Sequence, residues 1–231
     1  MALDAITLPD VSALTVGILG GTGDQGRGLA YRLASAGQRV LIGSRTAQRA
    51  ADAAVEIAAL AGLAADAVGG GENAQVAADA DVIIVAVPWD GHGELLETLR
   101  TPLAGKIVVD CVNPLGFDKQ GPYALAVAEG SAAQQAAALL PDSTVCAAFH
   151  HVSAALLADP AVAEMQLDVL VLGDDREAVG IVQALAGRIP GMRGVHAGRL
   201  RNAHQIEAFT ANLIAINKRY KAHAGLRVTD L

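Results

Sequence analysis

Hydrophobic residues along this chain gather in short continuous runs that alternate with segments in which they recur at helical spacing. Short apolar runs rich in Val, Ile and Leu are typical of buried strands, whereas apolar positions three and four residues apart are typical of helices. The pattern predicts strands at 15–19, 39–42, 82–87, 107–110 and 144–148, and helices at 26–35, 47–61, 91–99 and 132–139. A weak strand within 64–71 and a short helix at 73–78 complete this part of the chain.

The order of these elements predicts an α/β fold of the Rossmann type, because continuous apolar strands that alternate with helices form a doubly wound parallel sheet covered on both faces. Beyond residue 150 the pattern predicts strands at 169–172 and near 195, and helices that begin near 154, span 176–187 and run from 202 to about 223. Two strands are too few for another full Rossmann unit. We therefore expect a nucleotide-binding domain at 1–150, beginning with an extension at 1–14, and a smaller mixed α/β domain at 151–231 that closes over it.

The first predicted strand leads directly into a glycine-rich turn. Gly21, Gly23 and Gly26 hold the spacing G-x-G-x-x-G, and the helical pattern starts at the last of them. In a dinucleotide-binding unit such glycines let the backbone approach a pyrophosphate, and the helix that follows points its N-terminal amides at that charge. The motif alone is a weak signal, since 25 of the 231 residues are glycine. The strand before it and the helix after it favour a phosphate site over a merely tight turn.

The end of the second predicted strand indicates which dinucleotide binds. An NAD enzyme places an Asp or Glu here to accept hydrogen bonds from the ribose 2′-hydroxyl, but the chain has Ser44 and Arg45, followed by Arg49 one helical turn later. A guanidinium matches phosphate oxygens in bidentate geometry and stays charged at working pH. The residues therefore predict NADP(H), although Arg49 considered alone fits a solvated helix face equally well.

Three loops follow later strands and should lie along the same sheet edge as the glycine turn, where open α/β sheets bind ligands. The first loop holds Val87, Trp89 and His92, the second holds Asn113, and the third begins with His150. Each could be a plain turn or a solvated polar loop. Their shared position instead favours a lining for the nicotinamide half of the cofactor and for whatever faces it.

Composition and charge exclude several partners. A formal net charge of -7 argues against nucleic acid or an anionic membrane, and no apolar run reaches the ~18 residues that a membrane span needs. Cys111 and Cys146 lie in apolar runs without metal-ligand spacing, which predicts reduced packing residues and a cytoplasmic location. The adjacent His150 and His151 lack the accompanying ligands of a metal site, so we expect no metal.

Four motifs in this order and spacing resemble the F420H2:NADP oxidoreductase family, and the resemblance covers nearly the whole chain from Thr15 onward. These motifs are the glycine turn 20–28, Gly43-Ser44-Arg45, Val87-Pro88-Trp89-Asp90 and Phe149-His150-His151-Val152. The resemblance implies reversible hydride transfer between C4 of the nicotinamide of NADP(H) and C5 of the deazaflavin coenzyme F420, with the two rings stacked in a cleft. It also implies a homodimer of an enzyme that binds only small-molecule cofactors.

The resemblance also implies a role for individual positions. Gly21, Thr22, Gly23, Asp24 and Gln25 would hold the pyrophosphate; Ser44, Arg45 and Arg49 the 2′-phosphate; Val87, Asn113 and Ala154 the nicotinamide; and His150, Val152, Ile214 and Leu226 the deazaflavin. No residue is expected to act as an acid or base, because hydride passes directly between the cofactors, although His150 could orient them. Ser153 and Ala208 depart from the family's pattern, which leaves the exact deazaflavin contacts open.

Two other functions stay open at this point. An NADPH-dependent reductase of a flavin, ferric ion or a small carbonyl or imine substrate would use the same first domain. A redox sensor would bind NADP(H) without catalysis and signal to a protein partner. A ring-sized apolar cleft beside His150 and Leu226 would favour the deazaflavin enzyme, and a cleft filled by side chains would favour the sensor.

Overall fold

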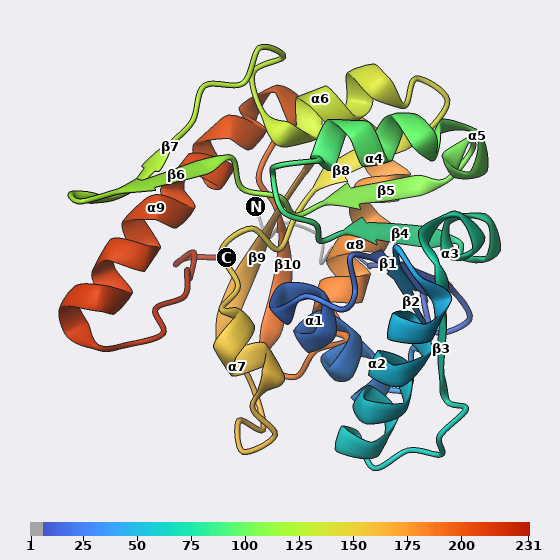
Figure 1. Ribbon diagram of the computed structural model, residues 1–231. Helices are drawn as coiled ribbons and strands as arrows, with labels where there is room; N and C mark the ends of the chain where they lie inside the picture. Colours follow the sequence, from blue (N-terminus) through green and yellow to red (C-terminus); the bar gives the residue numbers. More distant parts are fainter. Residues whose placement is uncertain (1–6) are drawn as a thin grey trace.

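A computed structural model describes residues 7–231 of the chain (Figure 1). The strands are β1 (Thr15–Leu19), β2 (Arg39–Ser44), β3 (Val68–Glu72), β4 (Val82–Val85), β5 (Ile107–Asp110), β6 (Leu115–Asp118), β7 (Gly121–Ala124), β8 (Thr144–Ala147), β9 (Leu167–Gly173) and β10 (Met192–His196). The helices are α1 (Asp24–Ser35), α2 (Ala47–Leu60), α3 (Asn73–Asp79), α4 (His92–Thr98), α5 (Arg100–Leu103), α6 (Ala132–Leu139), α7 (Ala154–Ala158), α8 (Arg176–Gly187), the 3₁₀ turn η1 (Leu200–Asn202) and α9 (Ala203–Tyr220). Of the expected N-terminal extension, residues 1–6 lie outside the described residues, and Val11 in its remainder packs into the core.

The main sheet has the strand order β10-β9-β8-β5-β4-β1-β2-β3. Six neighbouring strands, in the order β8-β5-β4-β1-β2-β3, are parallel to one another. This is the strand order of a dinucleotide-binding Rossmann sheet. The expected fold class is therefore confirmed. Strand β9 is antiparallel to β8, and β10 is parallel to β9, so the last two strands run against the first six.

Helices cover both faces of this sheet, as Figure 1 shows. Helices α1, α2, α7 and α8 bury their apolar residues on one face in a single cluster with the strands. Helices α3, α4, α5 and α6 contribute to a second cluster on the other face. Because the strands are enclosed between two layers, their side chains are apolar at nearly every position, which explains the continuous runs in the sequence. The carboxyl ends of the six parallel strands meet at one edge.

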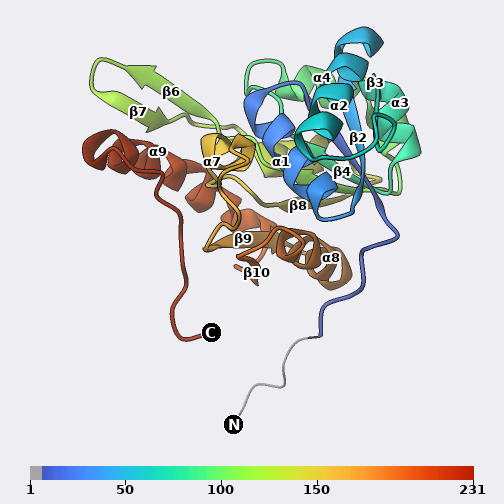
Figure 2. The same ribbon diagram turned by 90° about the horizontal axis from the view of Figure 1, so that it is seen from below.

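The predicted strands and helices agree closely with the observed ones, and the main differences lie in irregular regions. The predicted helix 91–99 corresponds to α4, and the short helix α5 that follows it was not predicted. The hairpin of β6 and β7, which was not predicted, leaves the sheet and lies beside α9, at the left of Figure 1 and again in Figure 2. The expected domain boundary at residue 150 falls within one continuous sheet, because β9 and β10 join the strands before it.

Helices α1 and α7 pack tightly against each other. Because α7 directly follows the His150 loop, this contact holds the end of that loop close to α1. A Cβ on Gly28 of α1 would lie 2.5 Å from Cβ of Leu157 on α7, so only glycine permits this approach. Arg32 on the same helix is buried, and its guanidinium donates to four carbonyls at the end of α7 and just beyond it: Leu156, Leu157, Asp159 and Val162. A cation at a helix C-terminus is favourable, and here it also satisfies carbonyls that would otherwise be partly buried without partners.

Replacing Arg32 with Met should lower the free energy of unfolding by on the order of 3 kcal/mol. Met retains the apolar stem but leaves the four carbonyls without their donor, and an unsatisfied buried group costs about 1–3 kcal/mol. Urea unfolding of the variant measures the loss, with Arg39→Met as the control because Arg39 is exposed at the start of β2. Equal stability of the two variants would show that the Arg32 contacts make no net contribution to the free energy of unfolding.

Candidate functional site

In the turn between β1 and α1, Gly20, Gly21 and Gly26 stand where there is no room for a side chain. The amide of Gly21 donates to the carbonyls of Ile18 and Gly43, at 3.2 and 3.0 Å. A Cβ on Gly26 would lie 2.7 Å from the Cα of Gly21, and a Cβ on Gly20 would lie 2.7 Å from a methyl of Val87. The turn is therefore held against the end of β2 on one side and the loop after β4 on the other.

The N-terminus of α1 faces this turn without a side-chain cap. Its N-cap is Gly23, and within the described residues no side chain accepts a hydrogen bond from the amides of the first turn. Uncapped amides and the helix dipole make such a terminus a ready site for an anion. A Cβ on Gly23 would meet little, with the Gly20 carbonyl oxygen 3.5 Å away, so its missing side chain leaves the amides open to an approaching ligand. The arrangement fits a pyrophosphate group.

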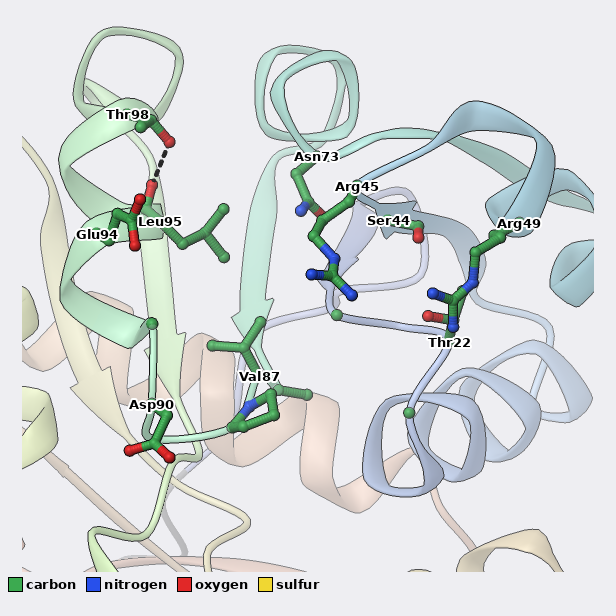
Figure 3. Close-up of a pocket in the computed structure, with 15 residues that line it drawn as sticks. Thr22, Ser44, Arg45, Arg49, Asn73, Val87, Asp90, Glu94, Leu95 and Thr98 are labelled. Carbon is green, nitrogen blue, oxygen red and sulfur yellow. Dashed lines mark hydrogen bonds between the residues drawn. The ribbon is translucent and has the colours of Figure 1, made fainter.

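A cavity of about 580 Å³ lies beside this turn, between the ends of β1 and β2 and helix α4 (Figure 3). The residues that line it are Gly20, Thr22, Gly23, Ser44, Arg45, Arg49, Asn73, Ala86, Val87, Pro88, Asp90, Gly91, Glu94, Leu95 and Thr98. Ser44 is buried at the end of β2, whereas Arg45 and Arg49 are exposed. In Figure 3 both guanidinium groups reach into the cavity near Ser44 and Thr22. The cavity thus combines one cationic, hydroxyl-bearing end with a side on α4 where Leu95 lies among the polar residues Asp90, Glu94 and Thr98.

A second cavity, of about 200 Å³, continues from the first. Both are lined by Ala86, Val87 and Pro88, and the smaller one adds Gln25, Trp89, Cys111, Val112, Asn113 and His150. These residues come from the loops that follow β4, β5 and β8, together with the first turn of α1. Three loops far apart in the sequence therefore meet at one sheet edge, as their positions after parallel strands predict.

The carbonyl groups of the His150 loop are held from several sides. Gln25 donates to the carbonyl of Phe149 at 3.3 Å, and Asn113 donates to the carbonyl of His150 at 2.9 Å. The hydroxyl of Thr210 on α9 also donates to the His150 carbonyl, at 3.1 Å. Phe149 has a φ of +65°, which is rare for a residue with a side chain and costs free energy that its surroundings must offset.

The imidazole of His150 is buried, and neither ring nitrogen has a hydrogen-bond partner within residues 7–231. Burial lowers the pKa of His150 to about 4, so the ring is neutral near pH 7. Burial likewise raises the pKa of the neighbouring Cys111 thiol, which stays protonated. With the uncharged amide of Asn113, these residues give the smaller cavity neutral polar groups.

His92 does not line either cavity. It is fully buried at the start of α4, where Nε2 lies 2.6 Å from Oδ2 of Asp110 and Nδ1 lies 3.0 Å from Oε1 of Gln135. Burial opposes the charged ring, but the hydrogen bond and charge of Asp110 raise the pKa of His92 above its ordinary value. The second oxygen of Asp110 accepts from the amide of Val112 at 3.0 Å, so the pair braces the loop that carries Asn113. His92 therefore stabilises the loop after β5 through Asp110 and does not itself line the smaller cavity.

Several other predicted site residues also lie outside the two cavities. Gly21 is buried within the turn, Asp24 is exposed, Val152 is buried in the core, Ala154 begins α7, and Ile214 lies half-buried on α9. The segment after α9 brings Leu226 against β9, where its carbonyl accepts from the amide of Asp168 at 2.8 Å. The structure thus brings together most of the predicted nucleotide residues. It does not gather the four predicted deazaflavin residues in one cavity.

Some residues of the site were not predicted from the sequence. Asn73, Leu95 and Thr98 line the larger cavity, Asp110 stabilises the loop after β5 beside the smaller one, and Glu207 on α9 holds the start of α6. The carboxylate of Glu207 accepts from the amides of Ala132 and Ala133 at the start of α6, at 2.9 and 3.1 Å. Asn73 and Asp110 carried a local signal, because Asn73 begins the predicted helix 73–78 shortly after the weak strand within 64–71, and Asp110 ends the predicted strand 107–110.

Two further observations concern the described residues as a whole. Within 7–231, no group of three or more His, Cys, Asp or Glu residues is placed to hold a metal ion. No helix in that part of the chain combines the length and apolar character needed to cross a membrane.

Known proteins with similar sequences bear directly on this site. Residues 15–114 match the family model described as NADP oxidoreductase, coenzyme F420-dependent. The chain is 38% identical over 227 residues to the F420-dependent NADP reductase of Methanothermobacter thermautotrophicus, covering 96% of this chain and 97% of that protein. It is also 38% identical over 224 residues to the protein of the same name from Methanocaldococcus jannaschii, covering 94% and 99%.

A solved structure of a candidate F420-dependent NADP-reductase from Arthrobacter sp. FB24 has a similar fold. It aligns with a TM-score of 0.79 and 24% identity, covering 94% of this chain and all of that one. At this identity the likeness concerns the fold alone.

Replacing His151 with Asn should make stability less sensitive to acid. Burial and the adjacent His150 lower the pKa of His151 to about 4, whereas the unfolded chain takes up the proton near 6.5. The free energy of unfolding should therefore fall as the pH drops below 6.5, by about 2 kcal/mol between pH 7 and 5 for this one group. Urea unfolding at both pH values measures the change, and an equal loss in wild type and variant would rule out the buried neutral ring.

Proposed function

The chain belongs to the family of F420-dependent NADP reductases and is an oxidoreductase that uses NADP and coenzyme F420; we propose that its two joined cavities hold NADP(H). The observation that carries this proposal is their continuity at Ala86, Val87 and Pro88. One end offers cationic and hydroxyl groups, and the other offers neutral polar groups. An elongated dinucleotide with a phosphorylated ribose at one end matches this distribution.

The larger cavity would take the adenosine and phosphate groups. Thr22 and Gly23, at the uncapped start of α1, would bind the pyrophosphate through backbone amides. Ser44, Arg45 and Arg49 would bind the 2′-phosphate, for which the absence of a carboxylate at the end of β2 is essential. The same three residues would disfavour NADH, because without the 2′-phosphate their donors have no anion to bind.

The smaller cavity would take the nicotinamide ring. Val87 stands at its entrance, and Trp89, Asn113 and His150 line its interior. Bound NADPH would supply a hydride at C4 of the ring, and oxidised F420 would accept it at C5. The protein's task is then to orient and to exclude water, which the hydrogen bonds to the Phe149 and His150 carbonyls would serve by fixing the loop.

The deazaflavin would lie against the outer side of this cavity. We assign His150, Val152, Ile214 and Leu226 to its surroundings on the strength of the resemblance, with Ala154 at the nicotinamide border. Ser153 caps α7, and its Oγ lies 3.4 Å from Nδ1 of His223. This contact connects the loop that carries His150 and Val152 with the segment after α9 that carries Leu226. Gly21, Asp24 and Gln25 keep their proposed places around the pyrophosphate, Gln25 reaching on into the smaller cavity.

We also propose a homodimer formed through the hairpin β6–β7 and helix α9. A groove of about 570 Å³ lies between them and includes Tyr123, Ala208 and Phe209. Phe117 and Tyr220 are 68% and 73% exposed on the same two elements, which is unusual for aromatic side chains without a partner. The cytoplasmic location proposed from the sequence has support from Cys111 and Cys146, both of which are buried free thiols.

Purified protein mixed with NADPH and oxidised F420 should bleach the visible deazaflavin band, and NADH should bleach it far more slowly. Replacing Arg45 with Ala should weaken NADPH binding by ~1.5 to 3 kcal/mol, about 10- to 150-fold, while turnover at saturating NADPH stays nearly unchanged. Arg39→Ala, at the opposite end of β2, is the matched control. If the wild type used NADH as well as NADPH, the assignment of Ser44 and Arg45 would be wrong.

Replacing His150 with Ala should raise the Michaelis constant for F420 more than that for NADPH. Because the pKa of the buried ring is about 4, the ring stays neutral, and the ratio of variant to wild-type constants should be the same at pH 5.5 and pH 8. Steady-state kinetics with each cofactor varied in turn provides the measurement. A ratio that changes around pH 6.5 would indicate a ring that titrates in contact with solvent, and equal effects on both constants would remove the assignment to F420.

A further inference from the structure

His92 lines neither cavity, yet it connects two loops that both line the smaller one. Trp89, in the loop after β4, and Val112, in the loop after β5, lie in the wall of that cavity. The rings of His92 and Trp89 pack together, with their centroids 5.5 Å apart and their planes tilted by 30°. The imidazole reaches the loop after β5 through Asp110, which contacts the ring with one oxygen and accepts from the amide of Val112 with the other. One buried side chain therefore links two parts of the wall.

The hydrogen bonds around His92 determine its protonation state. Nε2 faces a carboxylate oxygen of Asp110 at 2.6 Å, and because a carboxylate only accepts, Nε2 carries a hydrogen. Nδ1 faces the amide oxygen of Gln135 at 3.0 Å, and this oxygen also only accepts. The amide is held in this orientation because its nitrogen donates to the carboxylate of Glu129 at 3.3 Å, which an amide oxygen would repel. Both ring nitrogens are therefore donors, and the ring is an imidazolium.

The charge of this imidazolium is balanced by a carboxylate inside the fold. His92 and Asp110 are both fully buried, so each charge requires the other. Glu207 on α9 adds a second negative charge from further away. Burial opposes the charged ring, but the hydrogen bond and charge of Asp110, with smaller contributions from Gln135 and Glu207, raise the pKa of His92 above its ordinary value of 6.5.

A buried ion pair is by itself a poor explanation of stability. Replacing such a pair with apolar side chains is often neutral or stabilising. The location of this pair, between two segments of the cavity wall, indicates a role in geometry. Trp89 is only half-buried, so packing does not enclose its ring, and an imidazolium at 5.5 Å adds cation–π attraction. Since a displacement of about 1 Å can slow a reaction 100-fold, a fixed wall matters for hydride transfer.

We propose that His92 is a positioning residue for hydride transfer, which holds Trp89 and the loop of Val112 and Asn113 in a fixed arrangement. This inference rests on the proposed function, in which the smaller cavity takes the nicotinamide ring. The phosphates of the cofactor would lie in the larger cavity, away from the His92 contacts. Loss of the imidazolium should therefore slow the transfer and release Trp89, while NADPH still binds.

The first test uses the cofactor-free protein, because Trp89 is the only tryptophan of the chain. A protonated imidazole packed on an indole quenches its fluorescence more strongly than a neutral one. Wild-type emission should rise as the pH increases through the pKa of His92, with a midpoint above 6.5, and His92→Gln should show no such step. Constant wild-type emission between about pH 6 and 9, or the same step in the variant, would overturn the proposal.

The second test compares His92→Gln with His92→Asn. The amide of Gln reaches the place of Nε2 and can still donate to Asp110, whereas the amide of Asn ends near the place of Nδ1 and leaves Asp110 without this donor. Single-turnover hydride transfer from NADPH to F420 should fall at least about 10-fold in the Asn variant and less in the Gln variant. The dissociation constant of NADPH, titrated without F420, should change by less than about 2-fold in both.

Gln183→Met is the matched control for a lost buried hydrogen bond. Gln183 is buried on α8 and donates to the carbonyl of Gly194 at 2.9 Å, and neither residue lines the two cavities. This variant should lose stability but keep the wild-type transfer rate and Trp89 emission. If the Asn variant fails to fold, the Gln variant and the wild-type pH titration still test the proposal.

Two kinetic results would contradict the positioning role of His92. One is an unchanged transfer rate in both His92 variants, and the other is a loss of NADPH affinity as large as the loss of rate. If the wild type itself transferred no hydride from NADPH to F420, the proposed function would fail first. The fluorescence titration would then still decide whether His92 holds Trp89.

Discussion

The whole site depends on how closely the turn after β1 approaches its two neighbours. Gly21 bonds to the carbonyl of Gly43 at the end of β2, and Gly20 contacts Val87 in the loop after β4. A side chain at either glycine would push one of these segments away. Because the turn touches both, it sets the distance between the cationic end of the larger cavity and the entrance of the smaller one. One backbone turn thus positions wall segments of both cavities.

The nucleotide-binding part of the fold could be predicted because its signals are local. A strand buried on both faces must be apolar throughout, and a turn position without room for a Cβ atom must be glycine. A short run of consecutive residues therefore suffices to identify β1 and the turn after it. The hairpin of β6 and β7 carried no such signal, since its residues are half-buried or exposed and include Gly116, Gly121 and Pro122. The antiparallel pairing of β9 with β8 depends on contacts between distant segments, which no local pattern records.

The same distinction separates the predicted residues that line the two cavities from those that do not. Ser44 and Arg45 follow a strand end whose position is known once the strand is found. His92 also follows a strand, but its partners Asp110 and Gln135 lie 18 and 43 residues further along the chain, and they draw the ring into the core. Sequence position places a residue at the correct edge of the sheet. Whether its side chain faces the ligand or braces a loop depends on partners that only the folded chain brings together.

The two cavities are also coupled through the helix that begins at the glycine turn. Gln25, in the first turn of α1, donates to the carbonyl of Phe149, whose positive φ must be stabilised by its surroundings. Further along the same helix, Arg32 holds the end of α7, which follows the His150 loop. One helix therefore presents uncapped amides beside the larger cavity and holds both the start of the His150 loop and the helix that follows it. A displacement of α1 would therefore alter both cavities at once, so that in the proposed assignment binding of the phosphates and the position of the nicotinamide ring would be coupled.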